Sequence, residues 1–194
     1  MPASRKFILA SASPRRKILL RQIGLEFEVR PSGVSEDHDV PQQPAGHVTI
    51  LSRRKAEAVA SGVADAIVVG ADTIVVLDGA ILGKPEDQAD AARMLRLLSG
   101  RTHTVFTGFT IIDKPSGRSV TAVETTEVTF RKLTADEIAA YVASGSPMDK
   151  AGAYGIQDDY GAVFVERING CFYNVVGFPL SRFYCELIKL QNNS

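Results

Sequence analysis

Cysteine is scarce in this sequence of 194 residues, which holds only Cys171 and Cys185. Two widely spaced cysteines are too few for a disulfide framework or a zinc site, so we expect a reducing, cytoplasmic compartment. The three histidines, His38, His47 and His103, likewise show no spacing typical of metal ligands. Disulfide-stabilised and zinc-dependent proteins are therefore not expected.

Neither sign of charge is in excess, and long apolar runs are missing. The chain carries 22 basic and 22 acidic side chains, which gives a formal net charge of zero. This balance argues against a nucleic-acid or membrane partner, and no stretch predicts a transmembrane helix. Neither the Walker loop nor the dinucleotide glycine fingerprint occurs, which argues against a P-loop or Rossmann enzyme.

What is present is the composition of an ordinary soluble globular protein, with 45% hydrophobic and 23% charged residues. This length is enough for one domain of generous size or for two small ones. No internal repeat, linker or low-complexity stretch divides the chain. We therefore expect a single domain over residues 1–194.

The most informative stretch is an apolar run over residues 67–77 that predicts a buried strand but contains Asp72. A carboxylate in such a run is costly unless it is paired or bound to a cation. An Asp-Gly turn at 78–79 predicts a hairpin, whose return segment brings Lys84 back beside Asp72. A structural salt bridge that closes the hairpin and a catalytic acid–base arrangement both remain open here.

A second candidate site follows the first predicted strand, where the serine-rich turn 11–13 leads into an amphipathic helix. Ser13 is a typical N-cap and Pro14 takes the first helical position, which places Arg15 and Arg16 in the first turn. Helix N-termini favour acidic side chains, so two arginines are unfavourable there unless they share an anion with the backbone N–H groups. The pattern favours a phosphate site over a solvated basic turn.

Two further candidates lie between this helix and Asp72. The polar loop 31–43 contains an acidic cluster with Glu36, which could hold a divalent cation through oxygen ligands or simply be solvated. The helix predicted over 44–61 carries Lys55, whose stem follows the apolar face of the helix. Its ammonium group could reach a cleft or extend to solvent.

The second half of the chain predicts several regular elements and one irregular segment. The regular elements are a helix between Asp87 and Gly100, a hairpin of 103–112 and 119–130, a helix opened by the Thr134–Glu137 capping box, a hairpin of 163–168 and 172–176, and a last helix over 180–190. The segment 146–162 is rich in glycine and polar residues and predicts a functional loop. Its Lys150, Tyr154 and Gln157 are groups of the kind that bind a phosphate, a base face and a base edge. His103 is a polar residue at the start of the first hairpin that could line a cleft.

Basic side chains in cleft-like contexts and carboxylates occur together in this chain, namely Arg15, Arg16, Lys55 and Lys84 with Glu36 and Asp72. That inventory suits metal-assisted chemistry on a polyphosphate. The cations neutralise phosphate oxygens, and the carboxylates hold a divalent metal and orient or deprotonate a water.

Five ordered motifs, spread over nearly the whole chain, resemble the Maf family of nucleoside triphosphate pyrophosphatases. They are Ser11-Ala12-Ser13-Pro14-Arg15-Arg16, Gly70-Ala71-Asp72-Thr73, Leu82-Gly83-Lys84-Pro85, Ser99-Gly100-Arg101-Thr102-His103 and the segment 149–157. The resemblance implies an α/β fold with a mixed β-sheet and flanking helices, similar to the inosine triphosphatase group, with a cleft between two lobes. It also implies hydrolysis of a nucleoside triphosphate to the monophosphate and pyrophosphate, with a divalent metal cation, magnesium or manganese, as cofactor.

The resemblance assigns roles to individual residues through these motifs. Asp72 would be the proton acceptor, and it would hold the metal together with Glu36. The residues that would bind phosphates are Ser11, Arg15, Arg16, Lys55 and Lys84. The residues that would match positions linked to substrate choice are Arg15, Thr73 and Gln157. The segment 149–157 favours the branch that acts on dTTP and UTP, in nucleotide-pool control or editing.

Two departures from the family pattern leave alternatives open. Asp158 and Asp159 follow Gln157 where glycine is usual, and Ser35 stands where an acidic residue often precedes the residue matched by Glu36. The alternatives are a non-catalytic nucleotide-binding regulator of cell division and a 7-methyl-GTP pyrophosphatase. Family habit further suggests a homodimer.

Overall fold

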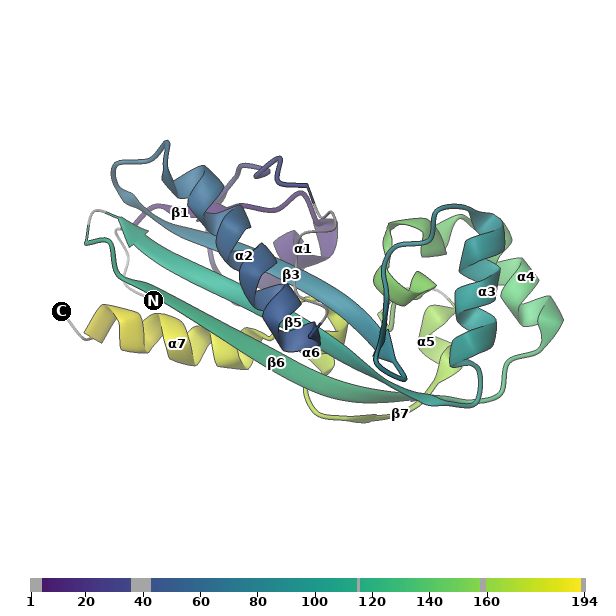
Figure 1. Cartoon of the computed structure of the whole chain (residues 1–194). Coiled ribbons are helices and arrows are strands. Elements are labelled where there is room, and N and C mark those ends of the chain that lie inside the picture. Colours follow the sequence, from purple (N-terminus) through teal and green to yellow (C-terminus); the bar gives the residue numbers. More distant parts are fainter. Residues whose placement is uncertain (1–4, 36–42, 115, 158–159, 193–194) are drawn as a thin grey trace. The chain divides into compact units, whose positions relative to one another are not determined.

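The computed structural model describes residues 5–35, 43–114, 116–157 and 160–192 (Figure 1). Strands and helices alternate along much of the chain. The strands are β1 (Phe7–Leu9), β2 (Glu28–Val29), β3 (Ala66–Leu77), β4 (Ala80–Leu82), β5 (Thr102–Lys114), β6 (Ser119–Phe130) and β7 (Val165–Asn169). The α-helices are α1 (Pro14–Gln22), α2 (Pro44–Ala60), α3 (Gln88–Leu98), α4 (Ala135–Ala143), α5 (Gly161–Phe164), α6 (Phe172–Val176) and α7 (Leu180–Asn192), with short 3₁₀ helices η1 (Ser146–Asp149) and η2 (Ala151–Ala153).

In the described part of the chain, the strands form one mixed sheet in the order β2-β1-β3-β5-β6-β7, with β4 paired to β3. Strand β1 runs parallel to β2 and to β3, and Ile8 lies opposite Val68. Strands β3 and β4 are antiparallel, as are β6 and β7. The predicted α/β fold class with a mixed sheet and flanking helices is confirmed.

The chain divides into two compact units. Unit 1 comprises Met1–Asp72, Thr107–Glu124 and Gly177–Ser194, and unit 2 comprises Thr73–Phe106 and Thr125–Val176. Strands β3, β5 and β6 each contribute residues to both units. Among the described residues, no helix has the length and apolar character that a membrane span requires.

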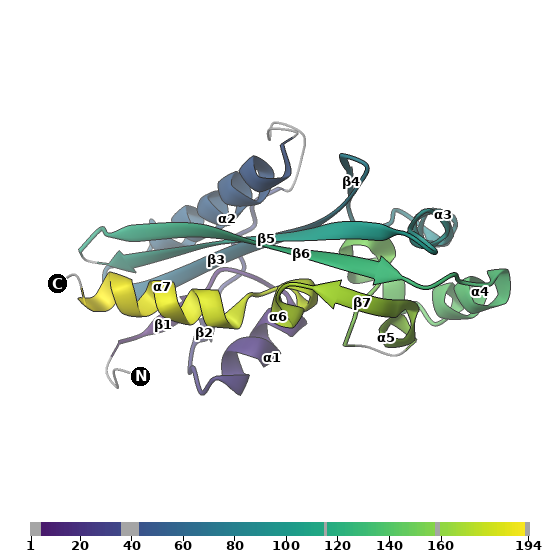
Figure 2. The ribbon, with the colours of Figure 1, turned by 90° about the horizontal axis from the view of Figure 1, so that it is seen from below.

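In unit 1, helices cover both faces of the sheet, with α2 on one face and α7 on the other (Figure 2). The core on the α7 side contains three buried phenylalanines. The ring of Phe109 from β5 lies 5.9 Å from that of Phe178 and 5.8 Å from that of Phe183, and the last two are 5.0 Å apart. These contacts place the start of α7 against β5.

On the opposite face, α2 approaches the sheet closely at two glycines. A Cβ atom on Gly70 of β3 would lie 2.3 Å from the carbonyl oxygen of Ser52, and one on Gly108 of β5 would lie 2.4 Å from that of Val48. Both distances are shorter than any van der Waals contact, so only glycine allows the backbone of α2 to come this close. The polar group of Ser52 is satisfied there, because its hydroxyl lies 3.1 Å from that of Thr110.

Unit 2 contains α3, α4, α5 and both 3₁₀ helices. Its core includes an aromatic cluster in which the rings of His103, Phe130 and Tyr154 meet edge to face. The predicted Asp-Gly turn between β3 and β4 is confirmed, because residues 78 and 79 both have positive φ, 51° and 81°. The Thr134–Glu137 capping box at the start of α4 is also confirmed.

The predicted hairpin strand over 172–176 is instead the helix α6, and β7 pairs with β6 rather than with this segment. The buried side chain of Asn174 explains the difference. Its amide donates hydrogen bonds to the Val105 carbonyl at 3.1 Å and to Thr126 Oγ1 at 3.0 Å. These tertiary contacts outweigh the β-propensity of the aromatic and β-branched residues around Asn174.

The segment 146–162, predicted as an irregular loop, is partly ordered into η1, η2 and α5.

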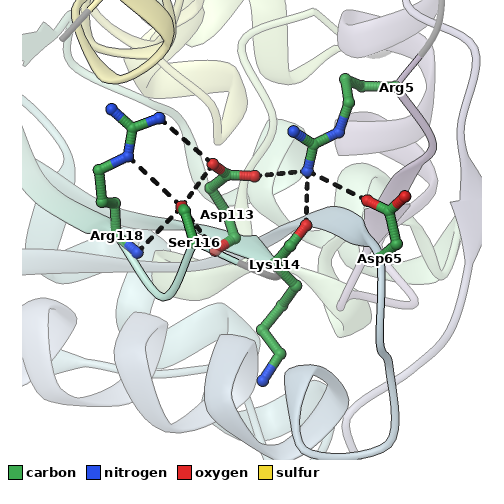
Figure 3. A network of polar contacts seen from close by, with 6 residues as sticks. All are labelled: Arg5, Asp65, Asp113, Lys114, Ser116 and Arg118. Atoms are coloured by element: carbon green, nitrogen blue, oxygen red, sulfur yellow. Dashed lines mark hydrogen bonds and ion pairs between the residues drawn. The ribbon is translucent and has the colours of Figure 1, made fainter. Parts of the chain in front are cut away.

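A network of charged residues ties the chain before β1 to the turn between β5 and β6 (Figure 3). Arg5 Nη2 contacts Asp113 Oδ1 and the Lys114 carbonyl, each at 2.5 Å. Ser116 donates to Asp113 Oδ2 at 2.6 Å, and Arg118 lies 3.5 Å from the same oxygen. Burial of Asp113 opposes its ionisation, but the hydrogen bonds from Ser116 and Arg5 and the nearby guanidinium charges lower its pKa.

Asp113→Asn is expected to lower the free energy of unfolding at pH 7 by about 1–3 kcal/mol, because hydrogen bonds to an ionised group are lost. A group whose pKa is lowered by folding stabilises the fold above its unfolded pKa, and this contribution disappears as the pH falls. The difference in stability between the variant and the wild type should therefore shrink in urea titrations as the pH falls below the ordinary pKa of an aspartate. Asp65→Asn is the matched control, since the Asp65 side chain is 74% exposed and lies 3.3 Å from Arg5. An equal loss for Asp113→Asn at pH 7 and pH 3 would contradict this account.

Candidate active site

The turn that precedes α1 is organised by two serine hydroxyls. Ser13 is the N-cap, as predicted, and its Oγ accepts a hydrogen bond from the backbone N–H of Arg16 at 3.5 Å. Ser11 Oγ accepts one from the backbone N–H of Ser13 at 3.2 Å. Pro14 occupies the first turn of the helix, and Arg15 beside it is half-buried. The local sequence therefore produces the helix N-terminus that suits an anion.

Arg16 turns into the protein from this helix start, with only 9% of its surface exposed. Its Nε donates to the Gly177 carbonyl at 3.1 Å, while Nη1 donates to Ser11 Oγ at 3.1 Å and to the Ala71 carbonyl at 3.0 Å. One guanidinium thus joins the turn before α1, strand β3 and the start of α7. Ala71 directly precedes Asp72. Arg16 therefore holds the serine turn close to the backbone that carries the Asp72 carboxylate.

The carboxylate of Asp72 forms a buried ion pair with Lys55. Nζ of Lys55 lies 2.7 Å from Oδ1 of Asp72, and the two residues are 6% and 5% exposed. The close approach of α2 at Gly70 explains why they meet, since Ser52 and Ala56, whose backbone atoms face Gly70, flank Lys55 in α2. Lys55 therefore does not extend to solvent, and its ammonium group is buried against Asp72.

A buried ion pair is weak evidence for stability, because the desolvation of two charges offsets most of their attraction. Apolar residues of similar volume would fill this part of unit 1 at no greater cost. The flanking residues of β3 are indeed buried and mostly aliphatic. The pair Lys55–Asp72 is therefore the strongest candidate for chemistry among the described residues of unit 1.

Unit 2 carries the other predicted site residues, Thr73, Lys84 and Gln157. Thr73 is half-buried in β3, whereas Lys84 and Gln157 are exposed. The segments that carry these two exposed residues are joined directly, because the backbone N–H of Gly152 donates to the Gly83 carbonyl at 3.0 Å. The structure thus gathers Ser11, Arg16, Lys55 and Asp72 in unit 1, and it links the segments of Lys84 and Gln157 in unit 2. The predicted metal ligand Glu36 lies outside the described residues, as do residues 158 and 159.

Of the two predicted ligands of a divalent metal, Asp72 lies within the described residues. No group of three or more histidine, cysteine, aspartate or glutamate side chains gathers there. The carboxylate of Asp72 fits magnesium, which is typically held by one or two carboxylates together with substrate phosphates. A carboxylate has two oxygens, so Asp72 can accept from Lys55 and still offer Oδ2 to a cation.

Tyr154, predicted as a group that binds a base face, and His103, predicted as a residue that could line a cleft, are both buried in unit 2. His103 is 2% exposed, and its Nε2 lies 2.7 Å from the hydroxyl of Tyr154, which is itself buried. Burial lowers the pKa of His103 from 6.5 to about 4 and raises that of Tyr154. The ring of Tyr154 is therefore enclosed within unit 2 and not exposed as a stacking surface for a base. The signal that could have placed His103 in the core is the alternation of side chains along a strand. His103 lies two residues before Val105, so both face inward.

Comparison with known proteins shows the family to which this chain belongs. Residues 6–190 match the family described as Maf-like protein. The chain belongs to the Maf family. A Maf relative from Moorella thermoacetica is 54% identical over 175 residues, which cover 90% of each chain, and it carries the name dTTP/UTP pyrophosphatase.

A relative from Pelotomaculum thermopropionicum has the same name and is 48% identical over 189 residues, covering 97% of this chain and 98% of its own. Among solved structures, a HAM1 protein from Coxiella burnetii matches 66% of this chain and 73% of its own at 14% identity, with a TM-score of 0.45. The predicted membership of the Maf family is confirmed.

Proposed function

We propose that this protein is a nucleoside triphosphate pyrophosphatase that converts dTTP and UTP to the monophosphate and pyrophosphate with the help of Mg²⁺ or Mn²⁺. The observation that carries the proposal is the buried ion pair between Lys55 and Asp72, 2.7 Å apart. The choice of dTTP and UTP is supported by the name dTTP/UTP pyrophosphatase, which a relative 54% identical over 90% of this chain carries. Such an enzyme would control or edit the pool of pyrimidine nucleotides.

The phosphates would bind at the start of α1 and at neighbouring basic side chains. A triphosphate brings several negative charges, which the backbone N–H groups of a helix N-terminus and the side chain of Arg15 are suited to meet. Arg16 keeps the Ser11 hydroxyl in place there. Lys55 and Lys84 would supply further positive charge, with Lys55 held in position by Asp72.

Asp72 would act on the attacking water. The water oxygen forms a bond to the α-phosphorus, and the bond from the α-phosphorus to the oxygen that bridges to the β-phosphate breaks. Pyrophosphate leaves with that oxygen, and Asp72 takes the proton that the water loses. A bound divalent metal would neutralise charge on the phosphates and lower the pKa of a water in its coordination shell. Glu36 is proposed as its second carboxylate ligand.

The base would be recognised by Gln157, with Thr73 and Arg15 as further determinants of substrate choice. A glutamine amide offers one acceptor and two donors. It can therefore pair with both the N3–H and the O4 of thymine or uracil. The exposed position of Gln157 at the end of a run of buried residues, 152–156, supports this role.

The test is the release of pyrophosphate from a panel of nucleoside triphosphates that includes dTTP, UTP and 7-methyl-GTP. The highest kcat/KM is expected for dTTP and UTP, and EDTA should abolish turnover until Mg²⁺ or Mn²⁺ is restored. A clear preference for 7-methyl-GTP would move the protein to the alternative substrate. No pyrophosphate from any nucleotide would leave a binding protein without turnover as the better account.

A further inference from the structure

We propose that His103 is a positioning residue for substrate choice, which acts through Tyr154 to hold the segment 151–157 so that Gln157 can meet the base. This inference rests on the proposed function for its substrate. The hydrogen bond between His103 Nε2 and the Tyr154 hydroxyl, 2.7 Å long, carries it. Both residues belong to unit 2, as does the whole segment.

The hydrogen bond is the one feature that histidine adds at this position. The His103 ring packs edge to face against Phe130 at 5.0 Å and Tyr154 at 5.3 Å, contacts that a phenylalanine would also make. Its Nδ1 is buried and has no hydrogen-bond partner among the described residues. A buried polar atom without a partner is unfavourable. The advantage of histidine over phenylalanine at this position is therefore the hydrogen bond between Nε2 and the Tyr154 hydroxyl.

Tyr154 is the central anchor of a segment that is held at several points. Before it, Gly152 and Ala153 both have positive φ, 67° and 60°, and such a conformation is strained for alanine. Gly152 is fixed by its hydrogen bond to Gly83, and a Cβ on it would lie 3.0 Å from the methyl groups of Val75. Strain of this kind persists only where the surrounding structure holds the backbone. Tyr154 is the residue directly after Ala153, so its buried side chain is one of the contacts that hold this backbone.

After Tyr154, the backbone on either side of Gln157 is brought together. A Cβ on Gly161 would lie 2.3 Å from the Gly155 carbonyl oxygen. Gly155 is the neighbour of Tyr154, so a shift of the Tyr154 ring moves one of the two chain segments that flank Gln157. The residues from 152 to 156 are buried and Gln157 is exposed. The position of the amide therefore depends on how firmly Tyr154 is held.

The test compares Tyr154→Phe, which removes only the hydroxyl, with Tyr141→Phe as the matched control. Tyr141 is another buried tyrosine of unit 2, packed against Phe164, and its hydroxyl has no hydrogen-bond partner in the described residues. For Tyr154→Phe the KM for dTTP and UTP should rise about tenfold, as loss of one anchoring hydrogen bond predicts. The kcat should change less than about twofold, because the phosphate and water contacts are not touched. Tyr141→Phe should leave both constants unchanged.

His103→Phe and His103→Gln complete the experiment. His103→Phe should reproduce the loss seen in Tyr154→Phe, the double variant should be no worse than either single variant, and His103→Gln should recover part of the loss. A fall of kcat for every nucleotide without a change in KM would overturn the proposal. Additive losses in the double variant would do the same.

Amide hydrogen exchange separates a failure of this inference from a failure of the proposed function, because it needs no turnover. Residues 151–157 should exchange faster in Tyr154→Phe than in wild type and in Tyr141→Phe. Unchanged exchange would overturn the inference even if dTTP is hydrolysed. Absence of hydrolysis by the wild type would overturn the proposed substrate but leave the exchange result to decide the role of His103.

Discussion

Replacing Asp72 with asparagine is expected to lower kcat for dTTP by about 10²–10⁴-fold, the usual contribution of a positioned general base. The amide of asparagine is a poor proton acceptor and carries no charge to offer a divalent cation. It nevertheless has nearly the same shape as the carboxylate, so the packing of β3 is preserved. The measurement is steady-state release of pyrophosphate at saturating dTTP and Mn²⁺.

Loss of folding must be separated from loss of chemistry, because Asp72→Asn leaves the buried Lys55 without its ion-pair partner. Removing one partner of a buried pair destabilises by about 3–5 kcal/mol. Asp113→Asn is the matched control, since Asp113 is also buried in unit 1 and paired to an arginine. The control should lose stability and keep its turnover. Folded Asp72→Asn that turns over within tenfold of wild type would show that Asp72 is not the base.

Gly70→Ala is expected to lower the free energy of unfolding by about 3 kcal/mol or more. The new Cβ would lie 2.3 Å from the Ser52 carbonyl oxygen and 2.6 Å from the Ala56 nitrogen. Both are backbone atoms of α2, so the helix itself must move away from β3. Such a movement would also draw Lys55 away from Asp72, and activity should fall together with stability.

Gly62→Ala is the control for this prediction. A Cβ at this position would meet only the Val59 carbonyl oxygen at 3.9 Å, an ordinary contact. Its free energy of unfolding should therefore stay within about 0.5 kcal/mol of wild type. Urea denaturation of both variants measures the difference. A Gly70→Ala protein as stable as Gly62→Ala would mean that α2 does not rest on β3 as closely as the structure shows.

Elements with local determinants could be predicted from the sequence. The Ser13 cap, the Thr134–Glu137 capping box and the Asp-Gly turn at 78–79 each depend on neighbours a few residues apart, and all three are present. The strand expected at 172–176 failed for the opposite reason. The conformation of that segment is decided by Asn174, whose partners lie far away in the sequence, on β5 and β6.

The candidate site shows the same division between local and distant contacts. The residue types were predictable, but the pairing of Lys55 with Asp72 was not, because it depends on α2 docking against Gly70. Arg16 was predicted as a phosphate ligand from its place in the first turn of α1. The structure shows in addition that it bonds to Gly177 and Ala71, contacts that no helix pattern contains.

The role of His103 was likewise hidden from the sequence. From the sequence, His103 was predicted only as a residue that could line a cleft at the start of a hairpin. Only the fold brings it to Tyr154, with which it forms a hydrogen bond of 2.7 Å. Burial rather than a neighbouring charge lowers the pKa of this histidine, and burial is a property of the assembled unit.

The central claim is that water attacks the α-phosphorus of a pyrimidine nucleoside triphosphate, and ³¹P NMR tests it most directly. Wild-type protein, dTTP and Mg²⁺ are mixed, and the phosphorus resonances are followed as the substrate disappears. The account predicts that resonances of dTMP and pyrophosphate grow together in equal amounts, and that Asp72→Asn slows both alike. Formation of dTDP and orthophosphate, or persistence of dTTP with folded wild-type protein, would contradict it.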